Sequence, residues 1–340
     1  MQIGIDSFVI NTPDATTGKS ISTAERIANV LAEIECADRA GLDVFGIGEH
    51  HRADFADSAP AIILAAAAAR TKRIRLTSAV TVLSADDPVR VFQDFATLDL
   101  VSGGRAEIIA GRGSFVDAYP LFGHSLEDYD SLFSEKLDLL LKIRDSVEVH
   151  WSGKHRAPLR GQGVYPRPIQ ARLPVWLGVG GTPDSFIRAG ALGLPLMVAI
   201  IGGNPARFRP LVDLYRAAGK EAGHPPEKLS VGVHAIGYVA ETREQAAADL
   251  APGYLRAFNE IGKERGWPPT TMAHFEAGVS PDGAFLVGDP EYVAGKIASF
   301  DEKLGGLSRI TFQMSAASLS HDRLLAAIRL IGEKLMPLLR

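Results

Sequence analysis

Three short segments of the sequence carry the residue types from which enzyme sites are built. The first is Glu49-His50-His51, and an imidazole is the side chain best suited to carry a proton near neutral pH. The second is Gly111-Arg112-Gly113, in which two glycines allow an anion held by the guanidinium to approach the backbone closely. The third is Gly178-Val179-Gly180-Gly181-Thr182-Pro183, which is typical of a phosphate-binding turn at a helix start. The second and third segments together indicate an anion site more strongly than either does alone.

Other familiar site patterns are absent from the sequence. Adjacent histidines in an extended segment point to opposite sides, so His50 and His51 cannot both face one metal as in a zinc protease helix. The pattern GxG occurs three times, but each copy lacks the third glycine of the dinucleotide-binding fingerprint, and no P-loop is present. By itself, His50 is equally compatible with a structural, hydrogen-bonded histidine.

Composition restricts the class of protein further. The chain has 340 residues, of which 46% are hydrophobic, so it can bury a large core without a disulfide or metal. Its single cysteine, Cys36, allows no internal disulfide. A net charge of -4 without long charged runs leaves no broad cationic face for nucleic acid. The longest apolar run, 59–69, is shorter than the roughly 20 residues of a membrane span, and no signal peptide is recognisable, so we expect a cytoplasmic protein without a membrane partner.

The elements that must position these segments alternate regularly along the chain. Short β-branched runs follow amphipathic helices, as a parallel sheet with crossover helices requires. Helix starts are marked by the capping-box spacing Ser22 to Glu25 and by Asp87-Pro88. The chemistry-bearing segments follow predicted strands, and ligands bind at the carboxyl ends of strands in a (β/α)8 barrel, the α/β fold that eight strand–helix pairs predict. The eight strands are expected at residues 2–9, 43–47, 74–82, 105–110, 174–179, 194–200, 229–239 and 308–313.

Two segments, near residues 150–172 and 241–289, depart from this alternation and are expected to be insertions. Glycines and prolines exclude a helix in the first, which we expect to be a loop over the barrel mouth. A lid is one use of such a loop, and a surface excursion without function is the other. One barrel of about 250 residues plus insertions accounts for the length, so residues 1–340 are expected to form a single barrel domain.

In this order the motifs resemble those of the bacterial luciferase-like flavin-dependent monooxygenases, a family of (β/α)8 barrels. The resemblance extends from the first strand to the strand at 174–179 and more weakly to the end of the chain. The segments that carry it are Gly41-Leu42-Asp43, Gly48-Glu49-His50-His51, Ser78-Ala79-Val80-Thr81-Val82-Leu83, Asp87-Pro88-Val89-Arg90, residues 98–105, Gly111-Arg112-Gly113, residues 165–170 and Val287-Gly288-Asp289-Pro290.

The resemblance implies roles for residues around a flavin ring. His50 matches the family's catalytic histidine beside the ring, and Ala79 and Val80 match a non-prolyl cis peptide under the isoalloxazine. The implied reaction uses reduced FMN and oxygen to oxidise a small organic substrate. A separate flavin reductase would supply the reduced FMN, in keeping with the missing dinucleotide motif, and a homodimer is expected from the family.

The resemblance also implies a site for the flavin phosphate. Arg112 matches the arginine that holds the phosphate, and Gly180, Gly181 and Thr182 lie where the family's phosphate loop sits. The chain departs from luciferase here, because glycines replace an acidic residue and a serine near that loop. Ser84 also stands where proline is common.

Three other functions are compatible with the sequence. One is a deazaflavin-dependent oxidoreductase on the same barrel, and another is a non-catalytic flavin-binding partner subunit. The third is a metal hydrolase using Asp6, Glu49 and His50, although no spaced ligand set supports it. An apolar barrel mouth is suggested by aromatic residues such as Phe8, Phe115, Tyr119 and Phe122, although aromatic residues near strand ends are as often part of the core.

Overall fold

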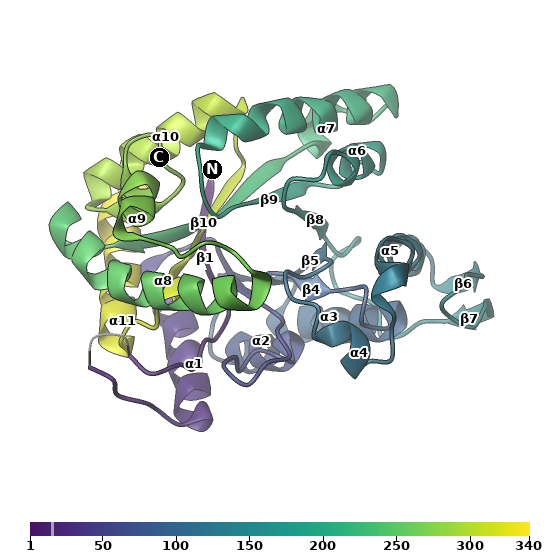
Figure 1. The fold of residues 1–340 in the computed structure, drawn as a ribbon. Helices are drawn as coiled ribbons and strands as arrows, with labels where there is room; N and C mark the ends of the chain where they lie inside the picture. Colours follow the sequence, from purple (N-terminus) through teal and green to yellow (C-terminus); the bar gives the residue numbers. More distant parts are fainter. Residues whose placement is uncertain (15–16) are drawn as a thin grey trace.

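Eight parallel strands close into a barrel in the computed structural model, which describes residues 1–14 and 17–340 (Figure 1). The barrel strands are β1 (Gln2–Ser7), β2 (Val44–Ile47), β3 (Arg75–Ser78), β5 (Ala106–Gly111), β8 (Val175–Val179), β9 (Leu196–Ile200), β10 (Val231–Val239) and β12 (Arg309–Gln313). Each strand pairs with the next in this order, and β12 pairs with β1 to complete the ring. The (β/α)8 barrel predicted from the sequence is therefore confirmed.

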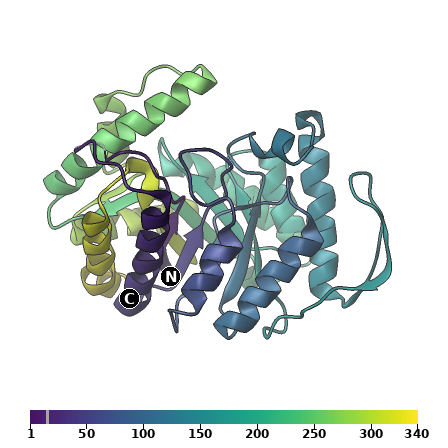
Figure 2. The ribbon, with the colours of Figure 1, turned by 90° about the horizontal axis from the view of Figure 1, so that it is seen from below.

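Helices surround the barrel and cover the outer face of its sheet (Figure 2). The predicted helix starts are present, because Ser22 accepts a hydrogen bond from the backbone of Glu25, and Asp87 accepts one from Val89. The helices around the barrel are α1 (Thr23–Ala40), α2 (Pro60–Ala68), α3 (Pro88–Ser102), α4 (Ala118–Leu121), α5 (Tyr129–Asp145), α6 (Pro183–Ala191), α7 (Arg209–Glu221), α10 (Pro290–Leu304), α11 (His321–Leu330) and α12 (Met336–Leu338). Short turns of 3-10 or π helix are η1 (Leu126–Asp128), η2 (Pro205–Phe208), η3 (Pro226–Lys228), η4 (Met314–Ala317) and η5 (Ile331–Leu335).

The strand predicted at 74–82 is divided in two. After β3 ends, the chain passes through a cis peptide bond between Ala79 and Val80 and continues as the short strand β4 (Thr81–Val82). The backbone N–H of Val82 donates to a side-chain oxygen of Glu49 over 2.8 Å, rather than to a neighbouring strand. The expected cis peptide is thus present, and the prediction of one continuous strand was wrong because the pairing with β5 stops at Thr77 and resumes only at Thr81.

The first insertion lies away from the barrel mouth. It contains an antiparallel hairpin of β6 (Glu148–Trp151) and β7 (Leu159–Gly163), seen beside α5 in Figure 1. The indole N–H of Trp151 donates to Asp138 on α5 over 2.8 Å, and the following turn is held by Glu135 of the same helix. The expectation of a loop over the mouth was therefore wrong, because these contacts with α5 hold the hairpin against the outside of that helix.

The second insertion contains two helices and one strand. These are α8 (Arg243–Arg265), α9 (Met272–Val279) and β11 (Leu286–Gly288), and β11 extends the sheet by pairing with the end of β10. Tyr254 packs against three phenylalanine rings of this segment, which forms part of the main core. The end of α8 reaches the barrel mouth, where Arg265 donates to the backbone oxygen of Ser114 over 2.5 Å. The helix crosses the face of the barrel that is nearest the viewer in Figure 1.

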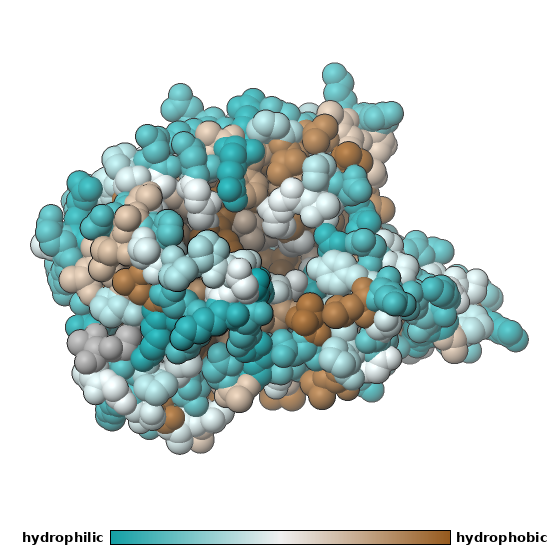
Figure 3. Space-filling view, viewed as in Figure 1, coloured by the Kyte–Doolittle hydropathy of each residue, from teal (hydrophilic) through white to brown (hydrophobic). Residues whose placement is uncertain are grey.

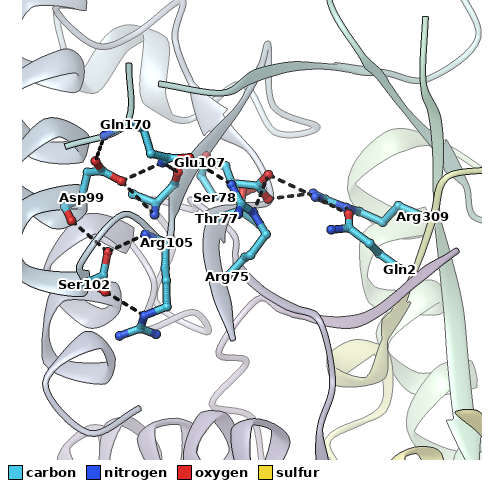
Figure 4. A network of polar contacts seen from close by, with 11 residues as sticks. Gln2, Arg75, Thr77, Ser78, Asp99, Ser102, Arg105, Glu107, Gln170 and Arg309 are labelled. Atoms are coloured by element: carbon cyan, nitrogen blue, oxygen red, sulfur yellow. Dashed lines mark hydrogen bonds and ion pairs between the residues drawn. The ribbon is translucent and has the colours of Figure 1, made fainter. Parts of the chain in front are cut away.

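A buried ionic network fills the amino-terminal end of the barrel (Figure 4). Glu107 accepts contacts from Arg309 over 2.9 Å and from Arg75 over 3.2 Å, and Arg309 also donates to Gln2 over 2.7 Å. Arg309 is only 1% exposed, and its guanidinium lies 4.2 Å from the centre of the Trp176 ring. Side chains from four strands thus occupy this end of the barrel, so ligands are expected at the opposite end.

One motif of the family resemblance is a structural connection. Arg105 donates hydrogen bonds to the backbone oxygens of Ala68, Thr71 and Ile74, so it satisfies carbonyls after the end of α2. Asp99 accepts from Gln170, as Figure 4 shows. The segment at 98–105 therefore fixes the link between α3 and β5.

None of the helices in the described part of the chain combines the length and apolar character that a bilayer span requires.

Candidate active site

A cleft of about 510 Å³ opens at the carboxyl ends of the barrel strands. It forms the hollow near the centre of the face seen in Figure 3. Apolar side chains such as Ile109, Met197 and Phe208 make up part of its wall. The structure brings all seven predicted site residues to this one cleft: His50, Ala79, Val80, Arg112, Gly180, Gly181 and Thr182.

His50 follows β2 and is paired with a buried carboxylate. Its Nδ1 lies 2.9 Å from Oδ2 of Asp57, which has no exposed surface. Burial raises the pKa of the Asp57 carboxyl above its usual range. The imidazole also stacks on Phe55, with ring centres 4.3 Å apart. Because the carboxylate occupies Nδ1 and no described residue bonds Nε2, the second nitrogen is the one that can exchange a proton with a ligand.

Glu49 and His51 pair with each other and not with His50. His51 Nε2 lies 3.1 Å from one carboxylate oxygen of Glu49, while the other oxygen accepts the backbone N–H of Val82. The hydrogen bond to Glu49 raises the pKa of His51. The two histidines therefore have separate partners, as their adjacency predicts, and Glu49 fixes the loop that follows the cis peptide.

The residues suggested for a metal hydrolase do not form one ligand set. Asp6 pairs with His234, Glu49 with His51, and His50 with Asp57. Among residues 1–14 and 17–340, no group of three or more His, Cys, Asp or Glu side chains is arranged to hold a metal ion.

Arg112 and the glycine turn meet at the amino terminus of α6. One guanidinium nitrogen of Arg112 donates to the Ser185 hydroxyl over 3.1 Å, and another pairs with Asp130 at 2.5 Å. Thr182 caps the helix through its backbone, and its hydroxyl makes no capping hydrogen bond. Gly181 is exposed, and a side chain there would meet open space. A guanidinium, two hydroxyls and a helix terminus are the groups that bind a phosphate.

Two glycines on neighbouring strands make room for the side chain of Val80. A Cβ added at Gly111 would lie 2.6 Å from Val80 Cγ2, and one added at Gly178 would lie 2.7 Å from Val80 Cγ1. Both distances are far below van der Waals contact. These positions must therefore be glycine for Val80 to sit on the cleft wall.

The predicted aromatic mouth is present only in part. The ring centre of Phe8 lies 4.7 Å from that of His50, and Phe115 approaches the same histidine edge-on at 5.5 Å. Phe122 is half exposed and contacts His51 instead. Tyr119 is fully buried and stacks on Tyr129, so assigning it to the mouth was wrong because it belongs to the packed interior.

Sequence reasoning missed several partners of the site residues. Asp57 lies seven positions after His50, a short spacing that could have suggested a loop returning to the histidine. Ser185 lies one turn into α6, where its hydroxyl could have been expected near the phosphate turn. His234 lies in the middle of β10 with its Nδ1 2.6 Å from Asp6, and no local pattern marks this pair.

Comparisons with known proteins agree with this architecture. A 4-hydroxyprotoasukamycin monooxygenase from Streptomyces nodosus subsp. asukaensis is 27% identical over 294 residues, which cover 81% of this chain and 77% of that protein. A monooxygenase from Streptomyces bottropensis has the same fold, with a TM-score of 0.86, 22% identity and full coverage of both chains.

Two further structures with this fold bind different flavin-type cofactors. The oxygenating constituent of 3,6-diketocamphane monooxygenase from Pseudomonas putida, in complex with FMN, superposes with a TM-score of 0.80 at 19% identity and covers 99% and 98% of the two chains. An F420-dependent secondary alcohol dehydrogenase superposes with a TM-score of 0.77 at 19% identity, and the match covers 100% of this chain and 99% of that chain. The family profile described as luciferase-like monooxygenase matches residues 1–306, and the chain therefore belongs to the luciferase-like monooxygenase family.

Proposed function

We propose that this protein is an FMN-dependent monooxygenase that takes reduced FMN from a separate reductase. The observation that carries the proposal is that one cleft is lined both by a phosphate-type site, Arg112 with the Gly180-Gly181 turn, and by His50, whose Nδ1 is held by the buried Asp57. When bound, reduced FMN supplies the two electrons that activate oxygen for transfer of one atom to a small organic substrate. A homodimer forms part of the same proposal, on family grounds alone.

The phosphate side of the cleft fits a flavin mononucleotide. Arg112 would bind phosphate oxygens, held in place by its hydrogen bond to the Ser185 hydroxyl, and the exposed Gly180-Gly181 turn would let the phosphate reach the backbone N–H groups before α6. The pairing of Arg112 with Asp130 does not prevent this, because the Asp130 side chain is 79% exposed and such ion pairs are weak. Thr182, whose hydroxyl makes no capping hydrogen bond, lines the cleft and offers a side-chain contact beside the two glycines.

The opposite side of the cleft carries the acid–base group. Ala79 and Val80 contact one face of the flavin ring in this proposal, and His50 lies beside it. The carboxylate of Asp57 holds Nδ1 of His50, so Nε2 donates or accepts the proton during turnover. Phe8 and Phe115 surround the imidazole and exclude water from it.

Anaerobic titration with cofactors tests the proposal. We expect photoreduced FMN to bind more tightly than oxidised FMN and both to bind more tightly than the deazaflavin F420. If F420 binds best, the deazaflavin-dependent oxidoreductase replaces the monooxygenase. If no flavin form binds, both proposals fail.

Admitting oxygen to the complex with reduced FMN tests the role of His50. We expect a transient flavin absorbance whose lifetime is shorter in His50→Ala than in the unmodified protein. The matched control is His150→Ala, since His150 is exposed on the β6–β7 hairpin. Equal lifetimes in both variants would remove His50 from the chemistry and favour the non-catalytic flavin-binding subunit.

A further inference from the structure

A second histidine–carboxylate pair lies in the cleft, apart from His50. His234 is 8% exposed, and its Nδ1 lies 2.6 Å from Oδ2 of Asp6, which is 1% exposed. The hydroxyl of Thr311 donates to the same carboxylate oxygen. Both His234 and Asp6 line the cleft, and no described residue makes a hydrogen bond to Nε2 of His234. One nitrogen of this buried imidazole therefore remains available to a ligand.

Four neighbouring strands shape this pair. His234 on β10 is level with Thr311 on β12, and Asp6 on β1 is level with Gly46 on β2. A Cβ at position 46 would collide with Oδ1 of Asp6, so the glycine leaves the space in which the carboxylate sits. Oδ1 itself is buried without a hydrogen-bond partner. The Asp6 carboxylate thus has space beside Gly46, and one of its oxygens accepts two hydrogen bonds. These features indicate that Asp6 serves a chemical role rather than packing.

The pairing fixes which nitrogen of His234 carries the proton. An ionised carboxylate can only accept, so Nδ1 of His234 donates to Asp6, and in the neutral ring Nε2 then carries the lone pair. A lone pair facing a cleft accepts a hydrogen bond from a hydroxyl group of a ligand. The Asp6 carboxylate also stabilises the imidazolium that forms if the proton is transferred.

The surroundings of Nε2 determine what kind of molecule would bring that hydroxyl. The Phe8 ring lies nearly parallel to His234, with centres 5.6 Å apart and an angle of 14°. Phe8 also contacts His50, so it stands between the two histidines. Met197 and Ile109 also line the cleft, where they pack together. Such a wall favours a flat apolar ring over a charged or strongly hydrated ligand.

We propose that His234 is a second catalytic residue, which binds and deprotonates the hydroxyl group of a phenol- or enol-type substrate. The inference rests on the proposed monooxygenase function and names its substrate class. The O–H bond breaks, its electron pair stays on the substrate oxygen, and the proton forms the Nε2–H bond of an imidazolium paired with Asp6. The electron-rich substrate that results is the form most readily attacked by an activated oxygen atom. His50 remains free for the proton transfers at the flavin.

Binding of 4-nitrophenol to the FMN-saturated protein tests the proposal by calorimetry. The matched probe is 4-nitrotoluene, which has a methyl group in place of the hydroxyl. We expect 4-nitrophenol to bind at least about tenfold more tightly, and His234→Gln to abolish this difference. Glutamine can still donate to Asp6 but has no ring nitrogen to take the proton. His150→Gln, on the exposed hairpin, is expected to retain the difference.

A measurement on the unmodified protein tests the proposal even if the His234→Gln variant misfolds. In histidine-selective 15N NMR spectra, 4-nitrophenol should shift the Nε2 resonance of His234 and leave that of His150 in place. Equal affinities for the two probes, no binding of 4-nitrophenol, or an unshifted His234 resonance would each overturn the assignment of His234. Failure of FMN to bind in the same protein samples would instead overturn the proposed flavin function, and with it the catalytic role of His234.

Discussion

Replacing Arg112 by glutamine tests the proposed phosphate site separately from binding of the flavin ring. The guanidinium is 20% exposed and holds Ser185 at 3.1 Å, while its Asp130 partner is 79% exposed. The Asp130 pair is worth about 0–1 kcal/mol, so Arg112 can exchange it for a phosphate at little cost. A hydrogen bond between charged groups contributes about 1.5–3 kcal/mol. Arg112→Gln should therefore weaken FMN binding by roughly 10- to 150-fold.

Riboflavin, which lacks the phosphate, is the internal reference for this experiment. Its dissociation constant, measured by fluorescence titration, should change less than about twofold in Arg112→Gln. Arg188→Gln is the control variant, because Arg188 lies on the same helix α6 but contacts Phe133 and not the cleft. The reasoning is refuted if FMN and riboflavin lose affinity equally, or if Arg188→Gln weakens FMN binding as much as Arg112→Gln.

Three further outcomes follow from contacts elsewhere in the barrel. Gly46→Ala should lower the free energy of unfolding in urea by about 1–3 kcal/mol, because its methyl group collides with Asp6; Gly295→Ala, whose methyl group meets open space in a helix, should not lower it. Asp57→Asn should leave FMN affinity within about twofold but slow the reaction of bound reduced flavin with oxygen roughly tenfold or more in stopped flow, and an unchanged rate would contradict the role of the pair. Burial, together with Glu49, raises the pKa of Asp86 from 3.8 to about 6, so the folded protein binds a proton there that the unfolded chain has released. Unfolding free energy should therefore fall as pH rises from 4 to 6, by at most about 3 kcal/mol from this group, and Asp86→Asn should remove that fall.

Local sequence patterns were sufficient to predict the barrel and the site residues that follow its strands. Alternation of strand and helix patterns gave the eight barrel strands, because each pattern depends only on neighbours in the sequence. The interruption at Ala79–Val80 could not be delimited in this way, since it depends on where the chain leaves and rejoins its pairing with β5, a strand distant in the sequence. The hairpin after α5 was misplaced for a similar reason, because Trp151 is held by a helix face that composition does not reveal.

In the candidate site, too, residues in local motifs could be predicted, whereas partners distant in the sequence could not. His50 and Arg112 were identified because they follow strands whose ends must meet at one edge of the barrel. Asp57 lies in an irregular loop, and only its spacing of seven positions from His50 hints in the sequence that it is buried against that histidine. Asp6 and His234 are 228 positions apart and meet only when β12 closes the ring between β1 and β10. Such a pair requires the complete topology.

The ionic network at the amino-terminal end of the barrel has a kinetic consequence. Because Arg309, Glu107, Arg75 and Gln2 close that end, a ligand of the cleft enters and leaves at the carboxyl ends of the strands. A molecule bound deep in the cleft can then leave only after whatever covers it has departed. Under the proposed function, flavin and substrate would therefore enter, and flavin and product would leave, in a fixed order through the same end of the barrel.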